Sequence, residues 1–169
     1  MTSVTVTPSS ACTVDRNRTP KTEIRLATVD EMLAEAQTLF DEHYEEIARN
    51  KQVMVLKPDE PTYRKAEEMG TIFILSARQN DVLIGYSVNF VSNHLHYADL
   101  KLAQNDLLFI SKEHRGGRVG LRLIKDTENH ARSLGCKLML WHCKPSTPLN
   151  EILPRLKYGV QDIIYSKEI

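Results

Sequence analysis

The sequence predicts a domain of the α/β (α+β) class, in which helices cover both faces of a mixed sheet. Between residues 23 and 169, strand-like and helix-like segments follow one another in the order β-α-α-β-β-β-α-β-α-β. Such an order builds a layered domain of sheet and helices. The 169 residues are enough to bury a core, and 41% hydrophobic with 26% charged residues is typical of a soluble globular protein.

Residues 1–22 differ from the rest of the chain and predict an N-terminal arm. They are rich in Thr and Ser, contain Pro8 and Pro20, and hold too few apolar residues for a core of their own. Val4 and Val6 alternate with threonines, so a short edge strand laid on a partner is the alternative. The folded domain is expected over residues 23–169.

The domain should begin with a strand over residues 23–29 and continue into a long helix. Asp30 is the expected N-cap, and the apolar positions from Leu33 to Ile47 keep helical spacing. After a loop with two prolines, residues 62–69 predict a short helix that Gly70 ends.

Two strands joined by a tight turn are predicted next. Residues 71–77 are almost continuously apolar, and apolar side chains alternate over residues 80–90. Asn80-Asp81 is the expected hairpin turn. Residues 93–104 favour no element, and residues 106–111 predict another strand.

The last third of the chain predicts a helix, a strand, a helix and a strand. The first helix starts near Val119 and stops at Gly135, and its apolar stripe has helical spacing. A strand over 137–143, a helix over about 149–156 and a final strand over 158–169 complete the order.

The turn before Val119 is basic and rich in glycine, and reads Arg115-Gly116-Gly117-Arg118-Val119-Gly120. A helix N-terminus presents unpaired N–H groups and the positive end of its dipole, and glycines let a ligand approach the backbone. The turn therefore predicts a phosphate or pyrophosphate site. A tight turn followed by a solvated basic helix face is the alternative, because the spacing matches neither the P-loop nor the dinucleotide-binding fingerprint.

This strand, turn and helix resemble the acetyl-CoA-binding core of the GNAT superfamily of N-acyltransferases. The family motif Gln/Arg-x-x-Gly-x-Gly/Ala corresponds to Arg115–Gly120, in which Arg118 replaces the middle glycine. Tyr158-Gly159-Val160 is similar to the Gly-Phe turn of the family. The stretches "HLHYADLK" and "LKYGV…IIYSKEI" resemble acetyltransferases that tailed bacteriophages carry.

The resemblance implies a mostly antiparallel GNAT-like sheet that splays at the cofactor strands, with acetyl-CoA as co-substrate. The backbone of Phe109, Ile110 and Ser111 would pair with the pantetheine arm. The backbone N–H groups of the turn would hold the pyrophosphate, and these belong to Arg115, Gly116, Gly117, Arg118, Val119 and Gly120.

Transfer to an amine needs a group that accepts its proton. Asp106 begins the cofactor strand, roughly where the family often carries a carboxylate base, and a turn aspartate at a strand end is the alternative. His96 is a second candidate base, because histidine titrates near neutral pH. His94 and His96 alone do not make a metal site, so no metal is expected.

The general acid is less clearly marked. Many family members carry a tyrosine four residues before the glycine of the Gly-Phe turn, and Arg155 stands there in this chain. Tyr158 or Tyr165 is the expected substitute, and coenzyme A leaves easily as a thiolate.

The acceptor, an amine of a small molecule or a protein, is expected between His43 and Met69. Glu45, Glu46, Asp59 and Glu60 lie there and offer negative charge to a cationic amine. A solvated helix face and loop explain the same carboxylates.

Charge and cysteine content exclude other classes. Lys+Arg and Asp+Glu are equal at 22 each, which favours neither nucleic acid nor a membrane surface as partner. Three cysteines without a pairing pattern, and no apolar run of transmembrane length or signal peptide, predict a cytoplasmic protein, in the host cytoplasm if a phage encodes it. A homodimer is possible.

Two hypotheses on function follow. The first is an acetyl-CoA-dependent N-acetyltransferase. The second is a non-catalytic GNAT-fold protein that acts by protein contact, as a phage structural or host-interaction module.

Overall fold

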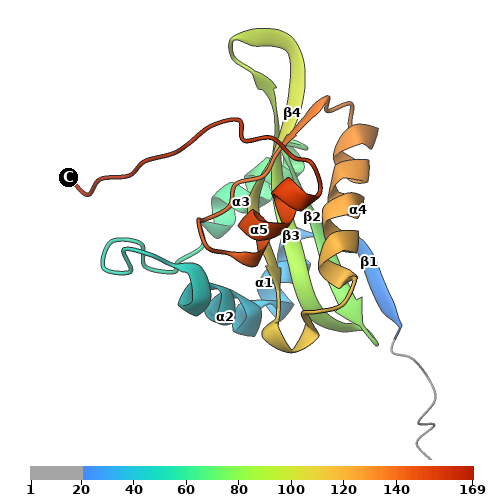
Figure 1. Ribbon diagram of the computed structural model, residues 1–169. Coiled ribbons are helices and arrows are strands. Elements are labelled where there is room, and N and C mark those ends of the chain that lie inside the picture. The colour runs from blue at the N-terminus through green and yellow to red at the C-terminus, as the bar shows by residue number, and fades with distance from the viewer. Residues whose placement is uncertain (1–20) are drawn as a thin grey trace, which may run out of the picture.

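Five strands form one sheet in the order β1-β2-β3-β4-β5 in the computed structural model, which describes residues 21–169 (Figure 1). All neighbouring strands are antiparallel except β4 and β5, which run parallel. The strands are β1 (Thr22–Ala27), β2 (Ile72–Gln79), β3 (Val82–His94), β4 (Tyr97–Ile110) and β5 (Leu138–Leu140). The predicted mixed, mostly antiparallel sheet is confirmed. The alternative strand at Val4 and Val6 lies outside the described residues.

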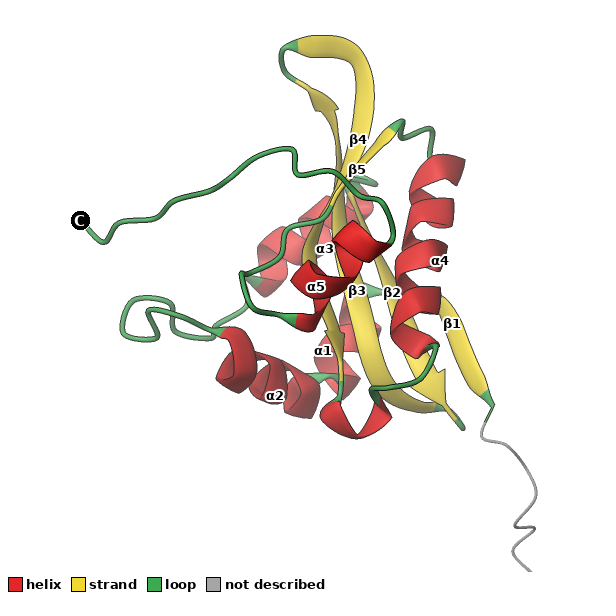
Figure 2. Cartoon of the chain, viewed as in Figure 1, coloured by secondary structure: helices red, strands yellow, loops and turns green. Residues whose placement is uncertain are grey.

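Helices cover both faces of this sheet, as predicted (Figure 2). On one face, Met32 and Leu39 pack against Ile72 and Ile74 of β2. On the other face, Leu123 packs against Leu75, because successive side chains of β2 point to opposite faces. The helices are α1 (Val29–Glu35), α2 (Gln37–Ile47), α3 (Glu60–Glu68), α4 (Val119–Ser133) and α5 (Pro148–Arg155). None of them is long and apolar enough to cross a membrane.

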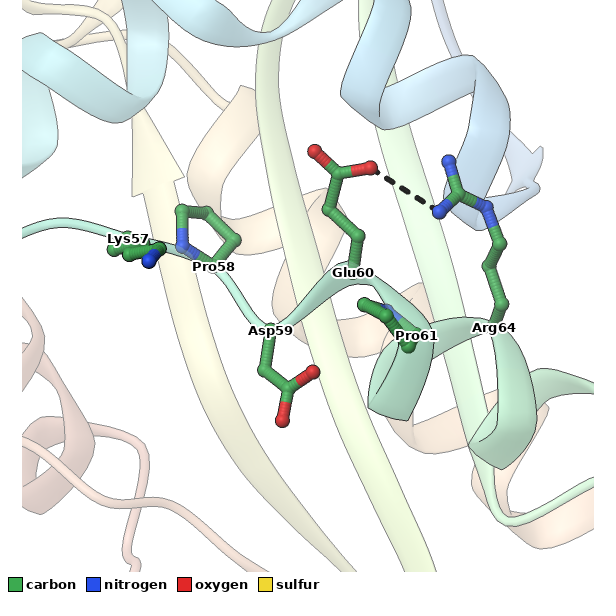
Figure 3. A pocket seen from close by; sticks show the side chains of 6 residues that line it. All are labelled: Lys57, Pro58, Asp59, Glu60, Pro61 and Arg64. Atoms are coloured by element: carbon green, nitrogen blue, oxygen red, sulfur yellow. Dashed lines mark hydrogen bonds and ion pairs between the residues drawn. The ribbon is translucent and has the colours of Figure 1, made fainter.

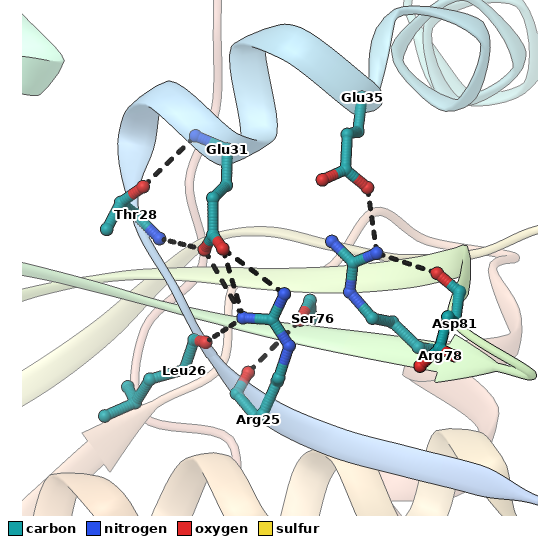
Figure 4. A network of polar contacts seen from close by, with 8 residues as sticks. All are labelled: Arg25, Leu26, Thr28, Glu31, Glu35, Ser76, Arg78 and Asp81. Atoms are coloured by element: carbon teal, nitrogen blue, oxygen red, sulfur yellow. Dashed lines mark hydrogen bonds and ion pairs between the residues drawn. The ribbon is translucent and has the colours of Figure 1, made fainter.

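The long helix predicted after Asp30 is two helices, and Asp30 is not its cap. The Thr28 side chain accepts a hydrogen bond from Glu31 N, and the Glu31 carboxylate accepts one from Thr28 N, so the two residues form a capping box (Figure 4). The chain then turns at the fully buried Ala36, which ends α1 and precedes α2. This turn directs Leu39 and His43 of α2 toward the sheet.

A polar contact fixes α1 on the sheet. The buried guanidinium of Arg78 on β2 lies 2.8 Å from Glu35 at the end of α1 and donates to the carbonyl of Asp81 (Figure 4). Asn80 and Asp81 have φ of 50° and 67°, which is the geometry of a two-residue type I′ hairpin. The predicted hairpin turn is thus confirmed.

Strand β4 is longer than the sequence predicted. Residues 93–104, which favoured no element, complete β3 and form the first half of β4, so the strand predicted over 106–111 is the second half of a 14-residue strand. Asp99 interrupts the apolar pattern there because the tip of the β3–β4 hairpin extends beyond the helices, where its side chains meet solvent (Figure 1). Lys101 interrupts it nearer to α4, where its ammonium group donates to the carbonyl of Leu134.

The C-terminal part of the prediction is partly wrong. The strand predicted over 137–143 is confined to the three residues of β5, whereas α5 is confirmed. The final strand predicted over 158–169 is not formed, because no strand of the described residues lies beside that segment. Its side chains Val160, Ile163, Ile164 and Tyr165 are consequently at least 71% exposed.

Candidate active site

Asp106 lies at an irregularity in β4. Val88 of β3 is opposite Leu107 and Asn89 is opposite Asn105, so Asp106 has no partner in β3 and forms a β-bulge. Bulges redirect side chains and are frequent beside active sites. Here the Asp106 carboxylate accepts a 2.8 Å hydrogen bond from the hydroxyl of Tyr63 on α3. Burial and this carboxylate raise the pKa of the Tyr63 phenol, which therefore keeps its proton.

Strands β4 and β5 separate next to this bulge. Their pairing ends at Gln104 and Leu140. The buried side chain of Asn105 then replaces a backbone partner: its Nδ2 donates to the His142 carbonyl, and its Oδ1 accepts from His142 N. The predicted splay therefore begins at Asn105, and β4 continues to Ile110 paired with β3 but without β5.

The free edge of β4 presents backbone groups beyond the splay. Ser111 N donates to the carbonyl of Ile84, and the two residues are opposite each other in the register. Since backbone groups of an antiparallel strand alternate in direction, those of Phe109 face β3, whereas those of Leu108 and Ile110 face the open edge. The backbone of three residues was predicted to pair with pantetheine. Of these, Ile110 faces the open edge, whereas the backbone groups of Phe109 and of the buried Ser111 face β3.

Arg115 fixes the glycine turn that follows. Its guanidinium makes two 2.8 Å hydrogen bonds to the carboxylate of Glu46 on α2, and its Nε donates to the Ile110 carbonyl. It also lies over the ring of Phe109. The guanidinium lowers the pKa of the Glu46 carboxyl. Gly116 has φ of +86°, in the left-handed region that glycine tolerates best.

The N-terminus of α4 has no cap of its own. The helix begins at Val119, as predicted, its N-cap Arg118 makes no side-chain hydrogen bond, and no acidic side chain stands in its first turn. A Cβ added at Gly117 or Gly120 would meet no atom within 4 Å. Unpaired N–H groups, the helix dipole and open space in front of the glycines suit an anion, so these residues fit a diphosphate.

A cavity of about 420 Å³ lies on the face covered by α1 and α2. Tyr63 and Leu107 bring it next to the Asp106 bulge, and Lys144 lines it from the segment that follows β5. The cavity is therefore bounded by both segments that separate at the splay, β4 and the segment after β5. The remaining lining residues are Val29, Leu33, Phe40, His43, Tyr44, Ile47, Ala48, Met54, Val55, Leu56, Lys57, Pro58, Ile74, Tyr86 and Val88.

His43 in this cavity was not singled out from the sequence. It is buried, its Nδ1 lies 2.8 Å from the Tyr86 hydroxyl, and its ring stacks on Phe109 with centroids 4.6 Å apart. Burial lowers the pKa of His43 to about 4, so the ring is neutral at pH 7. Its helical spacing from Ala36 and Ile47 was the available signal, because it places His43 on the apolar face of α2.

The other predicted catalytic residues, His96 and Tyr158, have surroundings of their own. His96 is exposed at the tip of the β3–β4 hairpin, ten residues from Asp106, or roughly 30 Å at the rise of an extended strand. Tyr158 donates its hydroxyl to Glu128 of α4, which also accepts from the indole of Trp141. Burial and Glu128 raise the pKa of the Tyr158 phenol. Within residues 21–169, no cluster of three His, Cys, Asp or Glu side chains could hold a metal ion.

A second, open pocket lies on the surface where α3 begins (Figure 3). Its acidic side chains already have partners: Asp59 accepts from Thr62 N, and Glu60 pairs with Arg64 at 3.1 Å. None of its lining residues belongs to the splay or to the glycine turn.

Comparisons with known proteins agree with this fold. Residues 33–150 match the model of the acetyltransferase (GNAT) family. No curated protein matches the chain. Among solved structures, an aminoglycoside acetyltransferase from an uncultured soil metagenomic sample has a TM-score of 0.68 at 14% identity, over 88% of this chain and 97% of its own.

Two further structures have other acceptors in their names. The ribosomal-protein-alanine N-acetyltransferase from Brucella melitensis biovar Abortus 2308 has a TM-score of 0.63 at 15% identity, over 88% of this chain and 97% of its own. Glucosamine-6-phosphate N-acetyltransferase from Arabidopsis thaliana has a TM-score of 0.63 at 13% identity, over 88% and 98%. At such identities the likeness shows a shared fold and selects no acceptor.

Proposed function

The chain belongs to the acetyltransferase (GNAT) family, and from this premise we propose that it transfers the acetyl group of acetyl-CoA to a primary amine. One observation carries the proposal: the uncapped N-terminus of α4, the free edge of β4 and the Asp106 bulge follow one another along a single continuous segment. A diphosphate, an extended amide chain and a reacting thioester would meet them in that order.

The chain's own groups would hold acetyl-CoA by its backbone. The N–H groups at Val119 and Gly120 would receive the pyrophosphate, and the exposed side chain of Arg118 adds positive charge. Leu108 and Ile110 would pair with the pantetheine amides as a neighbouring strand does. When bound, acetyl-CoA supplies an activated acyl carbon.

Asp106 is the residue that we assign to proton transfer. An amine with a pKa near 10.4 is mostly protonated at pH 7, and only its neutral form attacks a thioester. As the C–N bond forms and the C–S bond breaks, the amine nitrogen loses a proton, and the Asp106 carboxylate would accept it directly or through one water. Tyr63 would hold that carboxylate in place. Coenzyme A would leave as a thiolate, and Tyr158, whose hydroxyl donates to Glu128, stays the candidate for its proton donor.

The predictions on the alternative function, the cellular compartment, the origin and the oligomeric state go beyond this proposal. The non-catalytic alternative is less well supported, because the anion site, the free strand edge and the carboxylate are all present. A host-cell cytoplasm, a bacteriophage origin and a homodimer stay predictions, and the genes that flank the coding sequence would test the origin.

The test is release of free coenzyme A thiol when the protein, acetyl-CoA and an amine are mixed. We expect Asp106→Asn to lower kcat by a factor of about 10² to 10⁴, the usual contribution of a general base. Asp99→Asn, an exposed aspartate on the same strand, is the matched control. Equal activity of wild type and Asp106→Asn would contradict the assignment of the base, and no turnover with any amine would contradict the enzymatic function.

A further inference from the structure

The walls of the cavity beside Asp106 are apolar. Ring and branched side chains from α2 and the sheet form most of the surface, among them Phe40, Ile47, Ile74 and Val88. The loop between α2 and α3 adds Met54, Val55 and Leu56 at the rim, and Met54 and Val55 are 58% and 71% exposed. Exposed apolar side chains gathered at a cavity mark a surface that binds an apolar ligand.

No carboxylate lines the cavity. Its 18 lining residues include two lysines, Lys57 and Lys144, and no Asp or Glu. The acidic residues that the sequence offered as attractors of a cation have other partners: Glu45 pairs with Lys51 at 2.7 Å, and Glu46 with Arg115 at 2.8 Å. Asp59 and Glu60 line only the surface pocket of Figure 3.

The polar atoms inside the cavity are largely occupied. The ring of His43 contacts the Tyr86 hydroxyl, and the Tyr63 hydroxyl donates to Asp106. Lys144 donates to the carbonyl of Ile47 at 2.6 Å. A ligand therefore meets apolar surface along the cavity, and the Asp106 carboxylate lies just outside the lining, in contact with the hydroxyl of the lining residue Tyr63.

We propose that the acceptor is a primary monoamine on an aromatic or branched aliphatic body, and that polycationic amines are disfavoured. This inference rests on the proposed function. The amine would point to Asp106 and the apolar body would fill the cavity, whose 420 Å³ suit a molecule of this size. A second ammonium group would lose water beside Lys57 or Lys144 without gaining a carboxylate, which is unfavourable.

The experiment compares kcat/KM for 2-phenylethylamine and spermidine as acceptors. We expect 2-phenylethylamine to be favoured at least about tenfold, which corresponds to about 1.4 kcal/mol. Binding of each amine to the protein with coenzyme A is measured in parallel by thermal shift, so that recognition is observed without turnover.

Two matched rim variants test the charge argument. Met54→Glu places a carboxylate in the cavity lining, whereas Val53→Glu places one on the neighbouring residue, which is equally exposed at 58% but does not line the cavity. We expect Met54→Glu to shift selectivity toward spermidine at least about threefold, since opposite charges attract at short range. Val53→Glu should leave selectivity unchanged.

A second pair of variants tests the volume argument. Ala48→Phe fills the cavity from the end of α2, and Ala34→Phe adds the same ring to the exposed side of α1. We expect only Ala48→Phe to raise KM for 2-phenylethylamine, with KM for acetyl-CoA unchanged in both variants.

The outcomes separate this inference from the proposed function. Equal or better use of spermidine, or equal selectivity shifts in Met54→Glu and Val53→Glu, would overturn the inference and leave the acetyltransferase standing. Binding of acetyl-CoA without binding of 2-phenylethylamine would overturn it as well. Absence of acetyl-CoA binding would instead remove the proposed function itself.

Discussion

The hydroxyl of Tyr63 on α3 donates a 2.8 Å hydrogen bond to the carboxylate of Asp106 at the bulge in β4. The two residues are 43 positions apart, and their contact brings the wall of the cavity to the point where the sheet splays. It fixes the orientation of the Asp106 carboxylate, to which we assign proton transfer from the amine.

Tyr63→Phe should therefore impair turnover without affecting the cofactor site. We expect kcat to fall about tenfold, the value of one hydrogen bond to a charged group, with KM for acetyl-CoA unchanged. In a double variant with Asp106→Asn the effects should not add, because both residues act through one carboxylate. Steady-state kinetics of the four proteins measure this, and full additivity would show that Tyr63 acts elsewhere.

Burial of neutral His43 makes the fold sensitive to mild acid. The pKa of His43 is lowered from 6.5 to about 4, so the unfolded chain binds a proton more readily, and stability is lost as pH falls from about 6.5 toward 4. Between pH 7 and pH 5 the free energy of unfolding should drop by about 2 kcal/mol from this group. Urea unfolding at both pH values measures the drop.

His43→Gln, which keeps a polar partner for the Tyr86 hydroxyl, should flatten that dependence. The comparison is made above pH 5 because the pKa values of Glu31, Glu35 and Glu46 are lowered by their partners, and their contributions are lost only at lower pH. An equally steep decline in His43→Gln would rule out His43 as the source.

The Glu46–Arg115 pair should support the glycine turn from behind. Glu46→Gln removes the charge of a bidentate, half-buried contact, so we expect about 1–3 kcal/mol less stability and a several-fold higher Kd for acetyl-CoA. Glu45→Gln is the control, since the Glu45 side chain is 71% exposed in its pair with Lys51. Chemical unfolding and calorimetric titration give the two quantities. Identical results for both variants would show that the Glu46–Arg115 pair does not support the glycine turn.

Much of this fold could be predicted from the sequence. The hairpin at Asn80-Asp81 and the start of α4 at Val119 follow from local rules for turns and helix ends, and both are where those rules place them. The glycine turn could be recognised because its arginines and glycines all lie within one short segment, Arg115–Gly120.

What the sequence did not reveal depends on contacts between distant segments. The break at Ala36 and the length of β4 are decided by packing on the sheet, which a local pattern does not contain. His43 and Tyr63 each meet a partner 43 residues away, so the contacts of His43 with Tyr86 and of Tyr63 with Asp106 became visible only in the folded chain. The sequence offered Asp106 as a candidate base, but it did not predict the bulge that exposes this residue.

The unpaired C-terminal segment predicts self-association. Ile163 and Ile164 are 71% and 75% exposed, in a segment whose pattern favours a strand that no described strand completes. We expect dimers, in which this segment meets a second copy of the chain. Ile163→Asp together with Ile164→Asp should give monomers, whereas Gln161→Asp should not. Sedimentation equilibrium measures this, and a monomeric wild type would contradict it.

The central claim is that the N-terminus of α4 binds the diphosphate of acetyl-CoA. Calorimetric titration of acetyl-CoA into wild type, Gly120→Glu and Asn129→Glu tests it most directly. Glutamate in the first turn favours the helix dipole and replaces a helical glycine, so Gly120→Glu should fold at least as stably as wild type. Its charge would nevertheless occupy the diphosphate position. Micromolar binding by wild type and Asn129→Glu that Gly120→Glu loses is the predicted result, and unchanged binding by folded Gly120→Glu would contradict the account.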